Sequence, residues 1–325
     1  MTLHVALVTD AAYLPWCATA VRSVADHHGP GEAVVHVVHD GTVAGADERR
    51  LLESAGPLEL RVHRPGRAFV EHLPAVDRFG RVVWLRFLLP ELLGEVDRAL
   101  YLDADTLVVA PLEELQRLDL RGSPVGAVRN VMVPHEEERV RRLGLDPARF
   151  FNSGVLLLDL AALREEGLAA CAADVATALA GRLRWPDQDV LNVLFADRWA
   201  PLHPRFNAQN SLFEWPEASS AAHGREVRAD AVARPAVLHF EGPHLCKPWH
   251  ALSEHAWRDR YLATLARTPW AGVPLEDDGP TTRAIRRLPA RWRLPVYEQV
   301  VRARSGARPS VRGALRRRRH GSRLG

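Results

Sequence analysis

The stretch RALYLDADTLVVA, residues 98–110, says most about the fold of this chain. Apolar residues run up to Leu102 and resume at Leu107, so a buried strand is predicted to end or break at Asp103 and Asp105. Carboxylates at i and i+2 can both reach one hard cation, which keeps open positions for phosphate oxygens. The pattern therefore favours a metal and phosphate site, with a turn or helix-capping pair of acids as the alternative.

Strand and helix signals alternate around this stretch, which predicts an α/β fold with a doubly wound, mostly parallel sheet. In such sheets ligands bind beyond the carboxyl ends of the strands, where both Asp103 and Asp10 are expected. Residues 203–234 show little periodicity and are expected to be rich in loops. Other strands are expected at residues 3–8, 33–38, 58–62, 125–128, 150–160 and 236–240, and helices at 13–27, 47–54, 80–93, 160–180, 185–195 and 249–265.

Length and composition fit one large α/β domain with appendages, since 325 residues with 47% hydrophobic content can bury a full core. No run of 18 apolar residues is present, so we expect no transmembrane helix. The first residues, MTLHVALVTD, enter a strand without a basic region, which argues against a signal peptide. The three cysteines fit no zinc or redox motif, so a cytoplasmic location is expected.

The net charge of +3 conceals a basic C-terminal tail. Residues 283–325 hold 14 arginines and one acid, whereas the remaining 282 residues hold 29 basic and 39 acidic groups. Because Trp292, Tyr297 and several aliphatic residues accompany the arginines, the tail suits an anionic membrane surface at the inner face of the membrane. A disordered, solvated tail is the alternative, and nucleic acid is not expected. We expect a main domain over residues 1–278 and a tail, partly helical or disordered, over 279–325.

The only lysine among the 43 basic residues is Lys247. Lysine is a compact point charge that can approach a single phosphate oxygen, whereas arginine is a planar fork. His239 ends a predicted strand nearby, and Gly242 lets the backbone approach a ligand closely. This setting favours an anion-binding role for Lys247 over a chance survivor of codon bias.

Four segments resemble, in order and spacing, glycosyltransferase family 8, the retaining enzymes that include bacterial lipooligosaccharide galactosyltransferases and glycogenin. They are VTDAAY (8–13), YLDADT (101–106), FNSGVLLLDL (151–160) with PDQDVLN (186–192), and HFEG…KPW (239–249), and the resemblance spans residues 3–265. It implies a GT-A fold and retaining transfer of galactose or glucose from a UDP-sugar. It also implies a divalent metal, Mn²⁺ or alternatively Mg²⁺, and an acceptor that is a glycan, a lipid-linked molecule or a small metabolite.

The resemblance also implies roles for individual residues. Two carboxylates and an imidazole suit Mn²⁺ or a similar first-row ion better than Ca²⁺. The matching positions are Asp103, Asp105 and His239 for the metal, Asp10 and Tyr13 for uracil, Gly242 and Lys247 for the diphosphate, Arg86, Asn130, Asn152 and Gly154 for the sugar, and Asp187 and Gln188 for the reacting carbon.

The chain departs from the family pattern at two points. Ala12 stands where members often have asparagine, and the interval from Gly242 to Lys247 is longer than in many relatives, so this loop is expected to bulge. Retention requires either a covalent intermediate on Asp187 or front-face attack assisted by Gln188, and the sequence leaves both open. A phosphatase of the haloacid dehalogenase type, and a catalytically silent nucleotide-sugar-binding protein, are the alternative functions.

Overall fold

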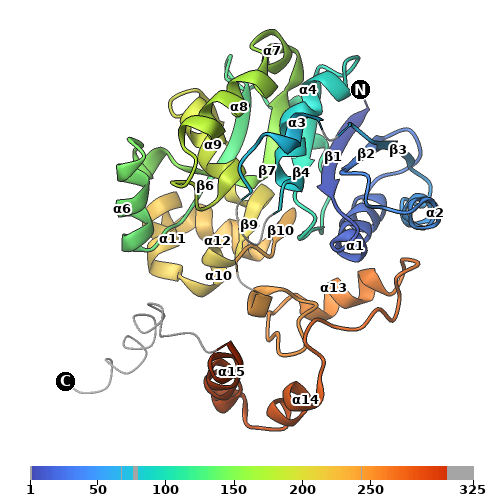
Figure 1. Ribbon diagram of the computed structural model, residues 1–325, viewed down its shortest axis with the longest axis vertical. Coiled ribbons are helices and arrows are strands. Elements are labelled where there is room, and N and C mark those ends of the chain that lie inside the picture. The colour runs from blue at the N-terminus through green and yellow to red at the C-terminus, as the bar shows by residue number, and fades with distance from the viewer. Residues whose placement is uncertain (1, 67, 76–79, 243, 306–325) are drawn as a thin grey trace.

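The computed structural model describes residues 2–66, 68–75, 80–242 and 244–305. Its centre is a seven-stranded sheet in the order β3-β2-β1-β4-β7-β6-β8 (Figure 1). Only β7 runs antiparallel to its neighbours, so the prediction of a mostly parallel α/β sheet is confirmed. The strands are β1 (Leu3–Thr9), β2 (Ala33–His39), β3 (Glu59–His63), β4 (Arg98–Leu102), β6 (Val125–Arg129), β7 (Phe151–Asp159) and β8 (Trp199–Pro201).

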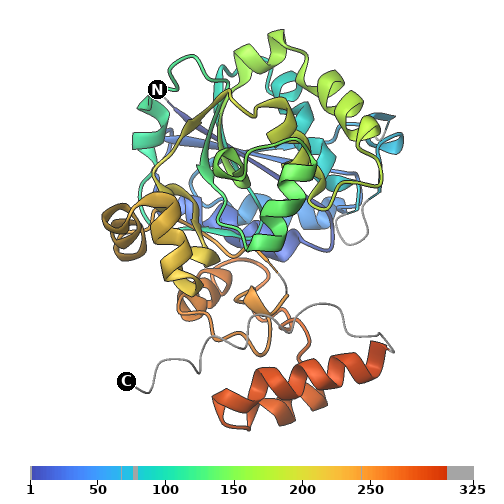
Figure 2. The same ribbon diagram turned by 90° about the vertical axis from the view of Figure 1, so that its left-hand side faces the viewer.

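Helices cover both faces of this sheet (Figures 1 and 2). Alternate residues of β1 pack into the hydrophobic cores on the two faces of the sheet, since Val5 packs on one face and Ala6 on the other. The first face is covered by α1 (Leu14–Ala25), α2 (Gly45–Ser54) and α13 (Arg258–Leu265). The second is covered by α3 (Ala68–Glu71), the 3₁₀ helix η2 (Val82–Leu88), α4 (Leu89–Leu92), α7 (Leu160–Glu165), α8 (Leu168–Ala178) and α9 (Pro186–Leu194).

A second, three-stranded sheet in the order β5-β10-β9 lies at the carboxyl end of β4. It consists of β5 (Thr106–Val108), β9 (Ala208–Gln209) and β10 (Val237–His239). Because β5 continues the chain directly after β4, the two sheets meet at the turn that contains the two acids. Other short helices outside the two layers are α5 (Glu113–Arg117), α6 (Pro134–Arg142), η3 (Pro147–Arg149) and η5 (His244–Cys246).

Three expectations about helices need correction. Residues 203–234 are mostly helical rather than loop-rich. The sequence does not show this, because the helices are too short for a periodic pattern and are separated at Trp215 and Gly224. Residues 80–93 form η2 followed by α4, which begins beside Pro90. The helix expected over residues 249–265 begins only at Arg258. The helices of the first segment are η4 (Pro204–Asn207), α10 (Asn210–Glu214), α11 (Pro216–His223) and α12 (Arg225–Ala233).

The described part of the basic tail forms α14 (Pro280–Arg286) and α15 (Ala290–Ser305). Both helices lie beyond α13, away from the large sheet, in the two views (Figures 1 and 2). Helix α15 contacts the preceding part of the chain where Tyr297 meets His250 and Arg293 pairs with Glu254. No helix in the described part of the chain is long and apolar enough to cross a membrane, and the arginine-rich residues 306–325 lie outside the described residues.

Candidate active site

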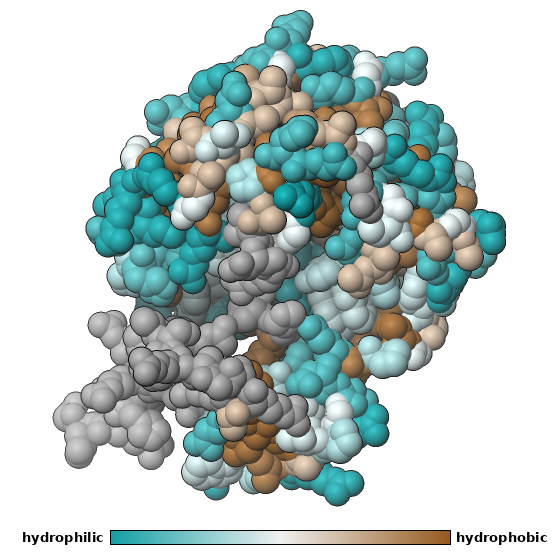
Figure 3. All heavy atoms as spheres, in the orientation of Figure 1, coloured by the Kyte–Doolittle hydropathy of each residue, from teal (hydrophilic) through white to brown (hydrophobic). Residues whose placement is uncertain are grey.

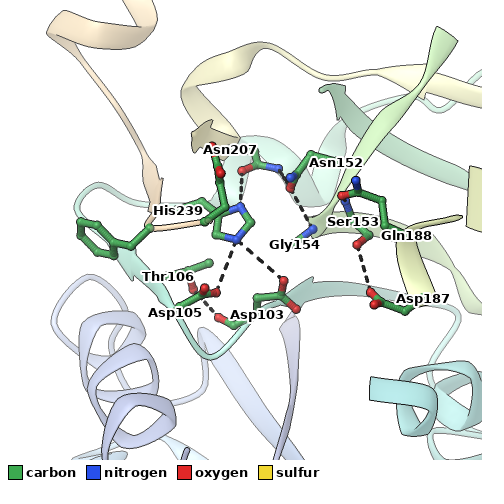
Figure 4. Close-up of polar contacts among 12 residues, drawn as sticks. Asp103, Asp105, Thr106, Asn152, Ser153, Gly154, Asp187, Gln188, Asn207 and His239 are labelled. Carbon is green, nitrogen blue, oxygen red and sulfur yellow. Dashed lines mark hydrogen bonds and ion pairs between the residues drawn. The ribbon is translucent and has the colours of Figure 1, made fainter. Parts of the chain in front are cut away.

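The two acids occupy the turn between β4 and β5 (Figure 4). The hydroxyl and the backbone N–H of Thr106 both donate to the carbonyl of Asp103, at 2.8 and 3.2 Å, and close the turn. The N–H of Asp103 donates to the carbonyl of Gly154 at 2.8 Å. Because β7 is antiparallel, its first residues lie at the same edge where the parallel strands end, so FNSG faces the acids.

Strand β10 brings His239 to the acids, because it pairs antiparallel with β5 and sets His239 opposite Thr106. The imidazole Nε2 lies 3.4 Å from Asp105 Oδ1 and 3.7 Å from Asp103 Oδ2 (Figure 4). One donor atom from each of these three residues lies within 4.8 Å of the others, so they can converge on one cation. This oxygen and nitrogen donor set fits a first-row divalent ion.

Two features orient the imidazole of His239. Its Nδ1 lies 3.0 Å from Asn207 Oδ1, and the Asn207 amide donates to Asn152 Oδ1 at 2.8 Å. Since an amide oxygen can only accept, Nδ1 carries the proton and the Nε2 lone pair faces the acids. The ring also fills the space beside Gly154, where an added Cβ would lie 2.1 Å from Cε1. The residues present therefore fit a metal held by Nε2 and two carboxylates.

The lone lysine points into the same cluster. The buried Lys247 ammonium contacts Asp105 Oδ2 and donates to the Phe240 carbonyl at 2.7 Å. Burial by itself raises the pKa of Asp105, but the charges of Lys247 and His239 outweigh it and hold that pKa below its usual range. For Asp103, burial and the charge of Asp105 raise the pKa despite a nearby arginine. The two carboxylates thus occupy different electrostatic surroundings.

Arg86 links the acid cluster to the segment PDQD. Its buried guanidinium lies 3.0 Å from Asp103 Oδ1 and 2.6 Å from Asp187 Oδ2. Ser153 donates its hydroxyl to the same Asp187 oxygen at 3.1 Å, and its N–H donates to Gln188 Oε1 at 3.0 Å (Figure 4). The carboxylate of Asp187 is therefore held in place by two donors.

The other residues named from the sequence lie around this centre. Asp10 follows β1 directly, as expected, and its carboxylate accepts from the Tyr13 N–H at 2.9 Å, at the start of α1. The Tyr13 ring is 38% exposed and meets Trp249, two residues after Lys247, edge-on at 6.1 Å. Asn130 follows β6, and its Oδ1 lies 3.4 Å from Asn152 Nδ2. Gly242 adopts a φ of 97°, which favours glycine.

Three residues of the site were missed by the sequence reasoning. Asn207 fixes His239, Ser153 joins Asp187 to Gln188, and the Tyr101 hydroxyl donates to Asp103 Oδ1 at 2.7 Å. Ser153 and Tyr101 lie inside motifs that were noticed. Asn207 lies in the segment misread as a loop and reaches His239 across 32 residues, so no local pattern points to it.

The fold and the acid–acid–histidine cluster at its edge define the architecture of a GT-A glycosyltransferase. The solved structure of the galactosyltransferase LgtC in complex with donor and acceptor sugar analogues matches with a TM-score of 0.71 and 23% identity, over 90% of this chain and 99% of that one. The model of "Glycosyl transferase family 8" matches residues 4–253. The chain therefore belongs to glycosyltransferase family 8, and it is a retaining glycosyltransferase.

Two curated relatives match most of the chain. General stress protein A of Bacillus subtilis (strain 168) is 26% identical over 246 residues, which are 74% of this chain and 84% of the relative. A lipopolysaccharide 1,2-glucosyltransferase of Escherichia coli (strain K12) is 26% identical over 283 residues, 86% of this chain and 80% of the relative. Both alignments extend over most of the chain.

Proposed function

We propose that this protein transfers a hexose, galactose or glucose, from a UDP-sugar to an acceptor hydroxyl with retention of anomeric configuration. The observation that carries the proposal is the convergence of Asp103, Asp105 and His239 with the lone Lys247 at the carboxyl edge of the sheet. An edge of this kind is where ligands bind in open α/β sheets. Acids that can hold a cation, next to a buried ammonium, suit the diphosphate of a nucleotide sugar.

The proposed metal is Mn²⁺, with Mg²⁺ as the alternative, held by Asp103, Asp105 and His239. When bound, it supplies positive charge to the leaving diphosphate. Lys247 adds a second positive charge at the same place, where negative charge grows as the bond to the sugar breaks. Asp10 and the exposed Tyr13 ring are proposed to bind the uridine end, and that binding energy positions the sugar beside the acceptor.

The contacts of Asp187 favour front-face attack over a covalent intermediate. Its Oδ2 is engaged by Arg86 at 2.6 Å and by the Ser153 hydroxyl at 3.1 Å. A carboxylate oxygen engaged by two donors has fewer free lone pairs, so it is a weaker nucleophile than a free one. We propose that Asp187 holds Arg86 near the sugar, while Arg86, Asn130, Asn152 and Gly154 line the sugar pocket and Gln188 contributes a dipole at the reacting carbon.

We also propose that residues 279–325 form a tail that holds the enzyme to an anionic membrane surface on its cytoplasmic side, separate from a catalytic domain over residues 1–278. Support comes from α15, where Trp292, Leu294 and Val301 are 53%, 44% and 41% exposed. Figure 3 shows an apolar patch in the region of the two tail helices, next to hydrophilic surface. Apolar side chains among arginines suit the boundary between headgroups and acyl chains.

The proposed chemistry is tested by UDP release from UDP-glucose and UDP-galactose with Mn²⁺, with Mg²⁺ or with EDTA. Asp105→Asn should abolish release, because it removes a ligand charge while keeping the side-chain shape. Asp97→Asn is the matched control, since this exposed acid precedes β4 at its opposite end. Undiminished release in EDTA would exclude the metal role. Binding of UDP without hydrolysis or transfer of any UDP-sugar would instead indicate a silent nucleotide-sugar-binding protein.

A further inference from the structure

An open pocket of about 460 Å³ lies at the edge strand β8, and none of the acid-cluster residues lines it. Its walls come from the end of β6, from η3, from β8, from the start of η4 and from α11 and α12. The side of the molecule that carries α11 faces the viewer in Figure 2. We call this pocket the side pocket. Its polar and aromatic lining residues are Arg129, Arg149, Trp199, His203 and His223.

The lining of the side pocket is cationic. It contains two arginines and two histidines and no acidic residue among the described residues that line it. The Arg149 guanidinium lies over the Trp199 ring at 4.9 Å, and Arg129 donates to the Ala222 carbonyl at 3.3 Å. Asp230 lies 3.8 Å from His203 but is already paired with the arginine that follows its own helix. The positive charge of the pocket is therefore not neutralised from within.

Two nitrogens in the lining lack partners. Arg129 Nε and His223 Nε2 are screened from solvent, yet neither has a hydrogen-bond partner among the residues that the structure describes. Buried polar groups are normally paired, so each of these nitrogens needs a partner that the described residues do not supply, such as a water or a ligand atom. Burial, then the charge of Arg129, lowers the pKa of His223 to about 4, so this ring is neutral near pH 7 and serves as a hydrogen-bonding group.

The tautomer of His203 is defined by a backbone contact. Its Nδ1 accepts from the Arg205 N–H at 3.3 Å, so Nε2 carries the proton and is a donor. Together, Arg129, Arg149 and His203 present N–H donors from three different elements of the fold. Donors on several walls of one pocket suit an oxyanion, and the volume is that of a small-molecule site rather than of a single ion.

We propose that the side pocket binds an oxyanion, specifically a phosphate group, either free or carried by a sugar-sized molecule. The site is separate from the donor site, because none of its lining residues belongs to the acid cluster. The two are connected through β6, since Arg129 precedes Asn130 and its carbonyl accepts from Gln209 Nε2 at 3.2 Å. The proposal does not rest on the identity of the donor sugar.

The test is calorimetric titration of the full chain, in EDTA and at constant ionic strength, with inorganic phosphate, glucose 6-phosphate and glucose. Arg129→Gln and Arg149→Gln should each weaken phosphate binding about tenfold or more, the usual effect of losing one charge-assisted hydrogen bond. His223→Gln is a third variant, in case loss of an arginine disturbs folding. Arg49→Gln is the matched control, because it removes the same charge from the exposed face of α2 and should leave binding unchanged.

The two phosphate ligands identify the source of the group. Tighter binding of glucose 6-phosphate than of inorganic phosphate assigns the side pocket to phosphorylated carbohydrates, and equal binding assigns it to free phosphate; both support the proposal. Binding of glucose as tight as that of glucose 6-phosphate would overturn it. So would phosphate binding that UDP displaces and that the three pocket variants leave unchanged, because that anion would occupy the donor site.

Discussion

Gly154→Ala should displace the imidazole of His239, the proposed metal ligand, without changing residue 239 itself. A Cβ at position 154 would lie 2.1 Å from Cε1 of the imidazole and 2.6 Å from Nε2. Ordinary contacts of a Cβ begin at 3.4 Å, so either the ring or the backbone must move by about 1.3 Å. Metal–ligand distances tolerate only about 0.2 Å, so a shift of this size takes Nε2 out of reach of the ion.

The ring, rather than the strand, is expected to move. The Gly154 carbonyl accepts from Asp103 at 2.8 Å and its N–H donates to Asn152 Oδ1 at 3.0 Å, so a shift of β7 would pull one acid away with it. Either displacement separates His239 from the carboxylates. Since even partners of a metal ligand contribute about 10- to 100-fold in affinity, losing a ligand should weaken Mn²⁺ binding by at least about 100-fold.

Free Mn²⁺ measured by electron paramagnetic resonance during a titration gives this affinity directly and needs no substrate. Two alanine variants are the controls. Gly45→Ala meets nothing within 4 Å, at the start of α2. Gly126→Ala meets the flexible end of Leu120 at 2.7 Å, in a strand position that does not contact the acids. Both should bind Mn²⁺ like the unchanged protein. Wild-type Mn²⁺ affinity in a folded Gly154→Ala protein would refute the assignment of His239 as a ligand.

Three further predictions follow from other parts of the chain. Lys247→Ala should lower kcat/KM for UDP-sugar hydrolysis by a factor on the order of 10²–10³, and Lys247→Arg should be only partly active; full activity of the arginine variant would exclude a point-charge role. His36 lies between the imidazoles of β1 and β3. Burial, the larger cause, and the two neighbouring rings, the smaller one, lower the pKa of His36 to about 3. The unfolded chain, with the ordinary pKa of about 6.5, therefore binds more protons than the folded chain between pH 3 and pH 6.5. The contribution of His36 to folding stability is complete above about pH 6.5 and is lost as the pH falls. His36→Asn should therefore reduce the fall in Tm between pH 7 and pH 4, whereas His135→Asn, at an exposed position, should leave that fall unchanged. A chain ending at Asp278 should keep UDP-sugar hydrolysis but lose salt-sensitive co-sedimentation with anionic liposomes; equal sedimentation of both forms would exclude the membrane role.

The fold was predictable wherever one element was long enough to show its period. The clear patterns belong to strands β1 and β2, with seven residues each, to β4 with five and to helix α1 with twelve. The order of these elements already implied a doubly wound sheet. Residues 203–234 failed for the opposite reason. Their helices have at most nine residues, and each is held by tertiary contacts rather than by an apolar stripe of its own.

The site was predictable where chemistry coincides with a strand end. Asp10, Asp103 and His239 each follow or finish a strand, and the structure brings the last two within 3.7 Å. The supporting contacts could not be read in the same way, because they join segments that are remote along the chain. Asn207 reaches both His239 and Asn152, across 32 and 55 residues, and only the folded arrangement of β7, η4 and β10 brings the three together.

The contacts at Asp105 explain why this chain, which uses arginine almost everywhere, places a lysine at position 247. The ammonium occupies a buried position where it must contact Asp105 Oδ2 and the Phe240 carbonyl together. An ammonium has three donors, so these two contacts leave one for a phosphate oxygen, whereas a planar guanidinium is larger and presents its donors in a fixed fork. The same pairing means that Asp105→Ala would leave a buried ammonium without its partner, which typically costs about 3–5 kcal/mol. Asp105→Asn therefore separates loss of the metal from loss of the fold, because the amide keeps an oxygen for Lys247 while removing the charge.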